Sequence, residues 1–284
     1  MIWQTARFKI DLSQPRVMGI VNITPDSFSD GGLHCSSTDG FSSVFAYCEK
    51  LVSEGADLLD IGGESTRPGA EPVTLSQELA RVLPVVRHAV TLGVPVSVDS
   101  YKPEVMRAVL DLGSDIINDV WAFRQPGAMQ AVAAHPNCGV CLMHMHREPQ
   151  TMQASPMHGD VVAQVKLFLT QAADRIFANG IEKSRIVLDP GVGFGKTVAQ
   201  NFALLARQRE FLADGYPVMV GWSRKSSLAL VCATAAGEKP GLQERMLLSV
   251  AAALLAVERG ARIVRVHDVR ETVQALKIWA AANS

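Results

Sequence analysis

Gly55-Ala-Asp-Leu-Leu-Asp60-Ile-Gly-Gly-Glu64 combines a glycine, a short apolar run and a polar end. Gly93-Val-Pro-Val-Ser-Val-Asp99 repeats this pattern, and so do the stretches that begin at Gly113, Gly180, Gly215 and Gly260. The glycine can end a helix, and a strand that is apolar on both faces is typical of a buried parallel sheet. If every strand presents its polar residue at the same end, those residues converge on one surface, which favours an enzyme.

The pattern divides the chain into alternating strands and helices. Apolar runs predict strands at residues 17–21, 57–61, 94–98, 115–117, 139–143, 185–188, 217–220 and 262–266. Helical spacing predicts helices at 76–92, 102–112, 160–179, 200–213, 242–259 and 269–282. Eight strands alternating with helices in 284 residues favour an α/β fold, a (β/α)8 or TIM barrel, over an open doubly wound sheet.

The two ends of the chain fit the same scheme. Arg7-Phe-Lys-Ile-Asp-Leu-Ser13 alternates with period two, which predicts a short N-terminal strand or hairpin that closes the bottom of the barrel. No low-complexity tract or charge block divides the sequence. We therefore expect a single domain over residues 1–284, with a barrel core at about 16–282.

The composition excludes several classes of protein. The net charge is −1 and the basic residues are spread along the chain, so no basic face argues for nucleic acid. The longest apolar run, Met246–Val257, is shorter than the ~18 residues of a membrane span, and Met1–Arg7 lacks a signal-peptide core. Five cysteines fit a reducing compartment better than a disulfide framework. These features predict a cytoplasmic protein without a membrane partner.

Four polar residues at strand ends are candidates for a binding site. Asp99, Asn118 and Asp189 each close an apolar run, and Lys225 follows another. Carboxylates accept hydrogen bonds from adjacent N–H groups, while an amide can both donate and accept. One such residue alone is explained by backbone capping. Four at equivalent ends suit a planar heterocycle with an aminopyrimidine edge, with the lysine donating to a carbonyl oxygen.

Arg265-Val-His267 places a cation and an imidazole on one face of a strand, because strand side chains alternate. The pair suits an anion, most simply a phosphate, and a structural ion pair is the competing interpretation of Arg265. Two long connections, Thr24–His34 and Glu64–Pro72, follow the first two strands and are typical of binding loops. Arg67 on the second loop could add to the positive field.

Two other motifs carry weaker signals. In Asp189-Pro-Gly-Val-Gly-Phe-Gly-Lys196, Pro190 stands where a Walker A loop needs glycine, and the glycine spacing does not fit a dinucleotide site. We expect a loop whose glycines let the backbone approach a ligand, with Phe194 covering a ring. The cluster Cys138–His146 lies on a predicted strand, so Cys138 and Cys141 should face opposite sides as buried thiols rather than bind a metal.

Several motifs together resemble the dihydropteroate synthase family of folate biosynthesis. They are Met18–Gly32, Asp60–Gly69, Ile117–Asp119, Leu188–Lys196, Ser223–Ser226 and Arg265–Asp268. They follow the family's order and extend over nearly the whole chain. The resemblance implies a TIM-barrel transferase that joins 6-hydroxymethyl-7,8-dihydropterin diphosphate to 4-aminobenzoate with Mg²⁺ and releases diphosphate. It also favours a homodimer.

The resemblance assigns roles to residues by matching motif. The residues that match the pterin-binding motifs are Asp99, Asn118, Asp189 and Lys225. Gly221 ends the strand that leads to Lys225. The residues implied to bind the diphosphate and its metal are Asn22, Arg265 and His267. The residues implied to bind the aminobenzoate are Thr66, Arg67, Pro68, Phe194 and Ser226. Ser226 should begin a helix whose N–H groups bind the carboxylate. Asp60 is expected to position the loop that carries Thr66 and Arg67.

Two residues depart from the family pattern, Trp222 before Ser-Arg-Lys-Ser and Leu248 where glycine is common. Two other functions stay open. One is a methyltetrahydrofolate-binding barrel of the cobalamin-dependent methyltransferases, which needs neither Ser-Arg-Lys-Ser nor Arg-x-His. The other is a pterin-binding module without catalysis, against which the diphosphate residues argue.

Overall fold

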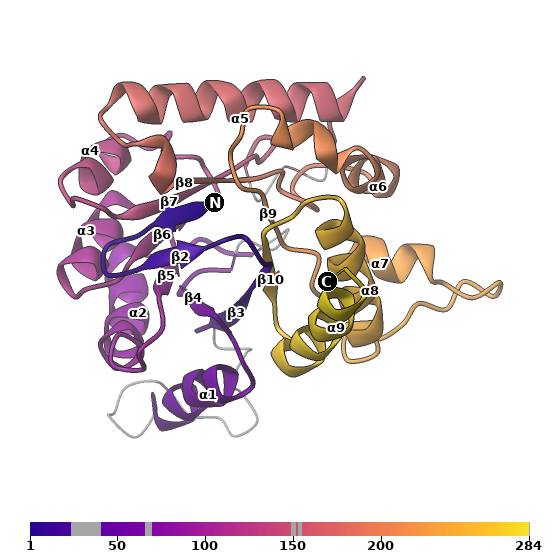
Figure 1. Cartoon of the computed structure of the whole chain (residues 1–284), viewed down its shortest axis with the longest axis horizontal. Coiled ribbons are helices and arrows are strands. Elements are labelled where there is room, and N and C mark those ends of the chain that lie inside the picture. Colours follow the sequence, from indigo (N-terminus) through magenta and orange to yellow (C-terminus); the bar gives the residue numbers. More distant parts are fainter. Residues whose placement is uncertain (24–40, 66–69, 149–151, 153–154, 284) are drawn as a thin grey trace.

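Eight parallel strands form the centre of the protein, and helices surround them (Figure 1). The structure, a computed structural model, describes residues 1–23, 41–65, 70–148, 152 and 155–283. The eight strands are β3 (Arg16–Asn22), β4 (Leu58–Gly62), β5 (Val96–Asp99), β6 (Ile116–Asp119), β7 (Gly139–Met143), β8 (Ile186–Asp189), β9 (Met219–Val220) and β10 (Ile263–Val266). Each predicted strand is thus present at its expected place.

A helix follows each strand and returns the chain to the bottom of the barrel. These helices are α1 (Ser42–Ser53), α2 (Leu75–Ala89), α3 (Pro103–Asp111), α4 (Ala128–Ala133), α5 (Val161–Ala178), α6 (Val198–Ala206), α7 (Ser226–Val231), α8 (Arg245–Glu258) and α9 (Val269–Ala282). Two follow β9, namely α7 and α8. The alternation confirms the predicted TIM barrel.

The ring of strands closes through a short contact. Hydrogen-bonded neighbours run in the order β8-β7-β6-β5-β4-β3-β10-β9, and a parallel bridge between Leu188 and Val218 joins the two ends of this series. The register places Gly62 beside Asp99 and Asp99 beside Asn118. Neighbouring strand ends therefore bring these residues together at the carboxyl end of the barrel.

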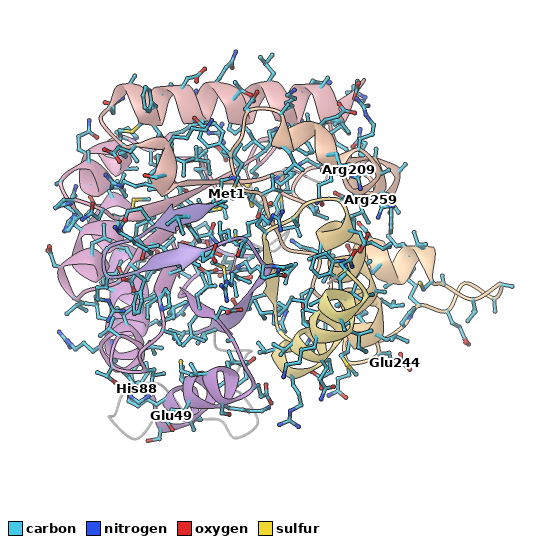
Figure 2. All side chains as sticks on the ribbon, in the orientation of Figure 1. Met1, Glu49, His88, Arg209, Glu244 and Arg259 are labelled. Atoms are coloured by element: carbon cyan, nitrogen blue, oxygen red, sulfur yellow. The ribbon has the colours of Figure 1, made fainter. Side chains whose placement is uncertain are left out.

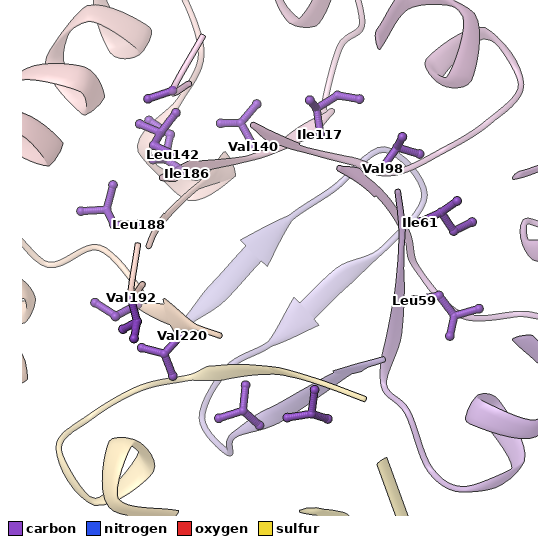
Figure 3. Packing of buried hydrophobic residues seen from close by; sticks show 14 of the residues in the cluster. Leu59, Ile61, Val98, Ile117, Val140, Leu142, Ile186, Leu188, Val192 and Val220 are labelled. Carbon is purple, nitrogen blue, oxygen red and sulfur yellow. The ribbon is translucent and has the colours of Figure 1, made fainter. Parts of the chain in front are cut away.

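The main hydrophobic core lies between the strands and the helices. Figure 3 shows Ile61, Val98, Ile117, Val140 and Leu188 pointing outward from the ring of strands. These side chains pack against buried faces of the surrounding helices, and all of them are buried. The opposite side chains of the same strands face the interior of the barrel, whose lower layer is apolar as well.

An antiparallel hairpin closes the bottom, as the period-two pattern predicts. It consists of β1 (Ile2–Gln4) and β2 (Lys9–Asp11) and crosses the ring in Figure 3. Trp3 is fully buried against the lower interior layer, and its Nε1 donates to the Arg185 carbonyl at 2.9 Å. Arg7 fastens the hairpin by an ion pair of 2.6 Å with buried Asp115.

One predicted helix is divided in two, while the bounds of the others differ from prediction by at most three residues at an end. The predicted helix 200–213 divides into α6 and the 3-10 helix η3 (Gln208–Leu212), with Arg207 between them at φ −103° and ψ 18°. On the outside, polar residues pair between helices: Glu49 on α1 lies 3.1 Å from His88 on α2 (Figure 2). None of the helices in the described part of the chain is long and apolar enough to cross a membrane.

Candidate active site

The interior of the barrel changes from apolar to polar over one step of the strands. Its lower layer contains Leu58, Ile116, Val187 and Ile263, all fully buried with the hairpin. Because strand side chains alternate, residues two positions later face the same interior one level higher. That level holds Asp60, Asn118, Asp189 and Arg265. The predicted convergence of polar strand ends is therefore present.

Arg265 forms the centre of this polar level. Its Nε donates to Asp60 Oδ2 at 2.5 Å, and its Nη2 donates to Asp99 Oδ2 at 3.0 Å. The guanidinium thus joins β10 to β4 and β5 inside the barrel. The ion pair that the sequence left as one interpretation of Arg265 is present.

Asp60 lies in the polar level, in contact with Arg265 and Asn118. Its side chain is fully buried, and besides Arg265 it accepts a hydrogen bond from Asn118 Nδ2 at 3.2 Å. Strand alternation points it into the barrel, so among the described residues its hydrogen bonds go to Arg265 and Asn118. Asp60 therefore holds Arg265 and Asn118, and since Thr66 and Arg67 lie outside the described residues, its expected role in positioning their loop stays a prediction.

Of two carboxyl groups in the site, Asp189 is buried and Asp99 is largely shielded from water, which disfavours their charged forms. Burial raises the pKa of Asp99 to about 7, although the Arg265 guanidinium opposes this shift. Burial also raises the pKa of Asp189. Two groups oppose this rise: the N–H of Gly191, which donates to Asp189 Oδ1 at 2.7 Å, and the charge of Lys225. Both carboxyl groups could accept N–H donors of a ligand in a low-dielectric setting.

The loop after β8, residues 190–196, is held by a buried lysine. Lys196 Nζ donates to the carbonyls of Gly191 at 2.7 Å and Phe194 at 3.1 Å, and it lies 3.0 Å from His144 Nδ1. Burial lowers the pKa of Lys196 to about 7. Gly191 has φ +67°, and a Cβ there would lie 1.9 Å from the His144 carbonyl oxygen. This glycine therefore permits close packing against the end of β7, and the predicted approach of the loop to a ligand stays a prediction.

Phe194, expected to cover a ring, faces the ammonium group of Lys225. Lys225 Nζ lies 4.3 Å from the centre of the Phe194 ring, a cation–π contact. Gly193 also borders this lysine, since a Cβ built there would lie 3.2 Å from Lys225 Cδ. The loop after β8 and the residue before α7 thus form one wall.

Ser223 links the Ser-Arg-Lys-Ser and Arg-x-His motifs. Its Oγ lies 2.9 Å from His267 Nδ1 and accepts the His267 N–H at 3.1 Å. Beside it, Arg224 Nη2 forms an ion pair of 2.6 Å with Asp268. Arg224 has φ +58°, a strained value for a residue with a side chain, which these contacts hold in place. The two motifs therefore form one unit that positions Lys225 and His267.

The two departures from the family pattern are accommodated by packing. Trp222 is buried against Phe202, with ring centres 5.3 Å apart. Leu248 packs at the margin of the main core. The next residue, Ser249, accepts the N–H of Arg224 at 2.9 Å through its Oγ. Neither departure displaces the strained turn at Arg224.

Ser226 opens α7, as predicted, and borders a cavity of about 290 Å³. The cavity is lined by Gly193, Lys196, Thr197, Val198, Asn201, Ser226, Ser227 and Leu230. It lies beside the wall formed by Phe194 and Lys225, with which it shares the loop after β8. Thr66, Arg67 and Pro68 lie outside the described residues.

The cysteine cluster behaves as the sequence predicts. Cys138 packs in the core between strands and helices, whereas Cys141 faces the barrel interior. Both thiols are buried, and burial raises the pKa of Cys138 to about 12. Within the described ranges, no three His, Cys, Asp or Glu side chains are grouped as metal ligands.

Asn22 offers a different kind of metal ligand. It ends β3 at the mouth of the barrel. A Cβ built on Gly62 would lie 3.6 Å from Asp99 Cβ and 3.8 Å from Asn22 Oδ1, so Asn22 and Asp99 border the same glycine. Mg²⁺ takes oxygen ligands and commonly binds one or two protein groups together with water and phosphate oxygens. This donor set fits a magnesium ion carried by a phosphorylated substrate.

Comparison with known proteins gives the family. The family model described as "Pterin binding enzyme" matches residues 18–267. A dihydropteroate synthase from Neisseria meningitidis is 46% identical, over 99% of this chain and 97% of the relative. The chain belongs to the dihydropteroate synthase family.

Solved dihydropteroate synthase structures share the fold. One from Xanthomonas albilineans, with 4-aminobenzoic acid, has a TM-score of 0.88 and 47% identity, over 97% of this chain and 96% of that chain. One from Burkholderia cenocepacia, complexed with 7,8-dihydropteroate, has a TM-score of 0.87 and 49% identity, over 99% and 96%.

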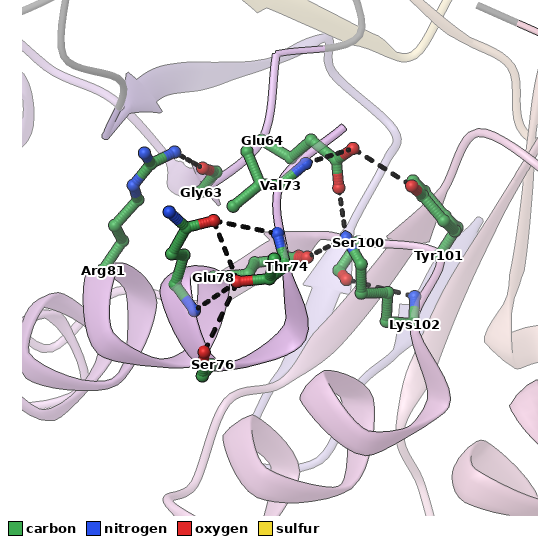
Figure 4. A network of polar contacts seen from close by, with 11 residues as sticks. Gly63, Glu64, Val73, Thr74, Ser76, Glu78, Arg81, Ser100, Tyr101 and Lys102 are labelled. Carbon is green, nitrogen blue, oxygen red and sulfur yellow. Dashed lines mark hydrogen bonds and ion pairs between the residues drawn. The ribbon is translucent and has the colours of Figure 1, made fainter. Parts of the chain in front are cut away.

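A polar network supports the loop whose dihydropteroate synthase motif contains Thr66, Arg67 and Pro68 (Figure 4). Glu64 Oε1 accepts the Val73 N–H at 3.3 Å and the Tyr101 hydroxyl at 3.0 Å. Lys102 pairs with Glu64 and, at 2.5 Å, with Glu78. The described ends of this loop are therefore tied to each other and to the end of β5.

Sequence reasoning on the dihydropteroate synthase motifs missed two polar residues behind the site. Asn201 is fully buried on α6, and its side chain joins the loop after β8 to α7. A signal was available, because Asn201 shares a helix face with the buried Leu204 and Leu205. Ser223 was quoted within a motif but received no role, and nothing in its local pattern predicts contact with His267.

Proposed function

We propose that this chain condenses 6-hydroxymethyl-7,8-dihydropterin diphosphate with 4-aminobenzoate to give 7,8-dihydropteroate and diphosphate. The observation that carries the proposal is the position of Arg265 beside Asp99, which puts a cation next to the candidate heterocycle pocket. Family membership supports it, and the relative from Burkholderia cenocepacia was solved with 7,8-dihydropteroate.

The pterin would occupy the polar level inside the barrel. Asp189 would accept hydrogen bonds from adjacent N–H groups, and Asn118 would bond a ring nitrogen and an amino group. Lys225 would donate to the pterin carbonyl oxygen, and Asp99 would accept a further N–H. Gly221 leaves space for the ring, since no atom of the described residues lies within 4 Å of a Cβ built there.

The diphosphate would lie at the mouth, near Arg265 and His267. Asn22, with its amide oxygen beside Gly62, would hold the Mg²⁺ ion that accompanies the diphosphate. When bound, Mg²⁺ would neutralise charge on the diphosphate oxygens. Arg265 would donate to those oxygens, which requires it to share its guanidinium with Asp60 and Asp99.

The aminobenzoate would bind between the loop after β8 and the start of α7. Phe194 and Ser226 flank this region, and Thr66, Arg67 and Pro68 would complete it. Support comes from the cavity at Ser226 and from the relative solved with 4-aminobenzoic acid. The N–H groups at the start of α7 would add to the attraction for a carboxylate.

The reaction exchanges one bond at the pterin methylene. The carbon–oxygen bond to diphosphate breaks, and the leaving group keeps the electron pair. The aryl amine then forms a carbon–nitrogen bond and releases a proton. Arg265 and His267 would stabilise the charge on the departing oxygens, while the electron-rich pterin spreads positive charge from the methylene. This division of charge favours a dissociative path.

One assay separates the candidate functions. The protein is mixed with the pterin diphosphate, 4-aminobenzoate and Mg²⁺, and dihydropteroate and diphosphate are measured. Equal amounts of both products are expected. Pterin binding without product would indicate a non-catalytic module, and methyl transfer from methyltetrahydrofolate would favour the methyltransferase-type barrel.

The proposal includes a homodimer. Apolar side chains are exposed on two neighbouring helices, Leu230 and Val231 on α7 and Met246, Leu247 and Leu255 on α8. A second copy of the chain would cover them. Light scattering is expected to give twice the chain mass for the natural protein and a lower mass for Leu247→Glu.

Two further points of the proposal concern the whole chain. A single domain over residues 1–284 is supported by the hairpin, which packs into the barrel bottom rather than apart from it. A cytoplasmic location is supported by Cys48, Cys138 and Cys141, which are buried as free thiols.

A further inference from the structure

The buried amide of Asn201 lies outside every role assigned so far. It stands on α6 with no exposed surface, on the face that also buries Leu204 and Leu205. Its Oδ1 accepts the Gly193 N–H at 2.8 Å, and its Nδ2 donates to Ser227 Oγ at 2.9 Å. Both ends of the amide therefore have partners, as a buried polar group requires.

The two partners of Asn201 come from different parts of the candidate site. Gly193 precedes Phe194, whose ring faces Lys225. Ser227 follows Ser226, the first residue of α7. Each partner is thus one residue away from a proposed aminobenzoate contact. Gly193, Asn201, Ser226 and Ser227 all line the same cavity of about 290 Å³.

An amide at this position joins the loop after β8 to α7 by two hydrogen bonds, in addition to the contact between Lys225 and Phe194. Lys196 joins residues within the loop, through the carbonyls of Gly191 and Phe194, and it also contacts His144. Lys196 therefore does not join the loop to Ser227 of α7, whereas Asn201 does so through a side-chain hydrogen bond. A leucine at position 201 would fill a similar volume on an apolar helix face but would leave the Gly193 N–H and the Ser227 hydroxyl without this partner.

We propose that Asn201 is a positioning residue that fixes the spacing between Phe194 and Ser226 and thereby sets the affinity for 4-aminobenzoate. This inference rests on the proposed function, since it deepens the assignment of the aminobenzoate subsite. Asn201 acts through Gly193 and Ser227, and it leaves the pterin contacts on β5, β6 and β8 in place because Asp60, Arg265 and Gly191 hold those.

The test compares Asn201→Leu with a matched control. Gln208→Met removes another buried amide. Gln208 lies on η3, is not among the residues that line the cavity, and donates to the Ala256 carbonyl at 2.7 Å. Both variants should lose similar thermal stability. Asn201→Leu should raise the KM for 4-aminobenzoate by about tenfold or more, whereas Gln208→Met should change it less than twofold. The Kd for a hydroxymethyl pterin without diphosphate should change less than twofold in both.

Two further variants separate positioning from general damage. In Asn201→Asp the carboxylate can accept both the Gly193 N–H and the Ser227 hydroxyl, so much of the natural KM should return. Ser227→Ala should raise the KM by itself, and adding it to Asn201→Leu should cause little further change. Equal KM values for Asn201→Leu and Gln208→Met, or a parallel loss of pterin affinity, would overturn the proposal.

Failure of the proposed function would be visible separately. Calorimetric binding of 4-aminobenzoate, with dihydropterin and diphosphate present, compares the same variants without turnover. A natural protein that binds these ligands but forms no dihydropteroate would contradict the proposed function, while the calorimetric ratio would still decide the role of Asn201.

Discussion

Arg265 on β10 and Asp99 on β5 are joined by an ion pair of 3.0 Å across the inside of the barrel. The same guanidinium contacts Asp60 at 2.5 Å, so one cation balances two carboxyl groups. In the proposed function this cation also stabilises the departing diphosphate. Folding and catalysis would therefore depend on the same side chain, and its variants should affect both.

Arg265→Met should cause two separable losses. Without the guanidinium, Asp60 and Asp99 remain buried without a cation, which should lower the free energy of unfolding by about 3–5 kcal/mol. Affinity should fall more for the pterin diphosphate than for a pterin that lacks diphosphate. Arg265→Lys keeps the charge but not the forked geometry, so it should be intermediate in both. Urea unfolding and calorimetry measure the two effects; equal affinity losses for both ligands would indicate a structural role alone.

Asp99→Asn should change the pH dependence of stability. The pKa of Asp99 is raised to about 7 in the folded protein from the ordinary 3.8, because burial outweighs the attraction of Arg265. Between these values the folded protein holds a proton that the unfolded chain releases, so the contribution of this carboxyl falls as pH rises. Asparagine does not titrate, so the variant should gain roughly 2–3 kcal/mol on the natural protein between pH 5 and pH 8.

Urea unfolding at the two pH values measures that gain. A variant that loses stability relative to the natural protein at the higher pH would show that the guanidinium lowers the Asp99 pKa more than burial raises it. Arg224→Met, which removes the ion pair with Asp268 outside the barrel interior, serves as a control. It should show no comparable difference between pH 5 and pH 8, because it leaves Asp99 and its contact with Arg265 unchanged.

Gly221→Val separates a binding role from a folding role. Within the part of the chain that the structure describes, no atom lies within 4 Å of a Cβ at this position, and the residue follows β9 at the level where the pterin would lie. The variant should therefore unfold within about 1 kcal/mol of the natural protein but lose most of its pterin affinity. Gly191→Val provides the contrast, because its Cβ would meet the His144 carbonyl and the fold itself should suffer. If Gly221→Val bound pterin with unchanged affinity, the pterin would not lie beside Gly221, and the proposed position would be wrong.

The barrel and the strand-end residues could be predicted because both depend on local pattern. Each strand lies in an apolar run, and Asp99, Asn118 and Asp189 stand where those runs end. The hairpin followed from the period-two alternation around Ile10. Parallel strands bring their carboxyl ends to one edge whatever the details of packing, so the gathering of these residues needed no knowledge of distances.

The partners within the site could not be predicted, because they depend on how the strands are staggered around the ring. Asp60 and Arg265 are 205 residues apart in sequence, and only the closed barrel brings them to 2.5 Å. The break at Arg207 was equally invisible, since the apolar spacing continues through α6 into η3. From the sequence, Asn201 is one polar residue on an apolar helix face, and its partners Gly193 and Ser227 are known only from the structure.

Lys102→Met should expose the importance of the network at the end of β5. Lys102 pairs with Glu64 and Glu78, and the side chain of Glu78 is almost fully buried (Figure 4). Without the ammonium group two carboxylates would share a buried site, which should lower the free energy of unfolding by about 3–5 kcal/mol. Lys50→Met is the matched control, because Lys50 is exposed and lies 3.7 Å from Glu54 on the helix surface.

The control should change the free energy of unfolding by less than about 0.5 kcal/mol, as exposed pairs at this spacing do. Because Glu64 also binds the Val73 N–H, Lys102→Met should loosen the ends of the loop between them. Hydrogen exchange at the Val73 amide should therefore quicken in this variant and stay unchanged in Lys50→Met. Similar unfolding energies for the two variants would mean that the buried carboxyl groups do not need their lysine.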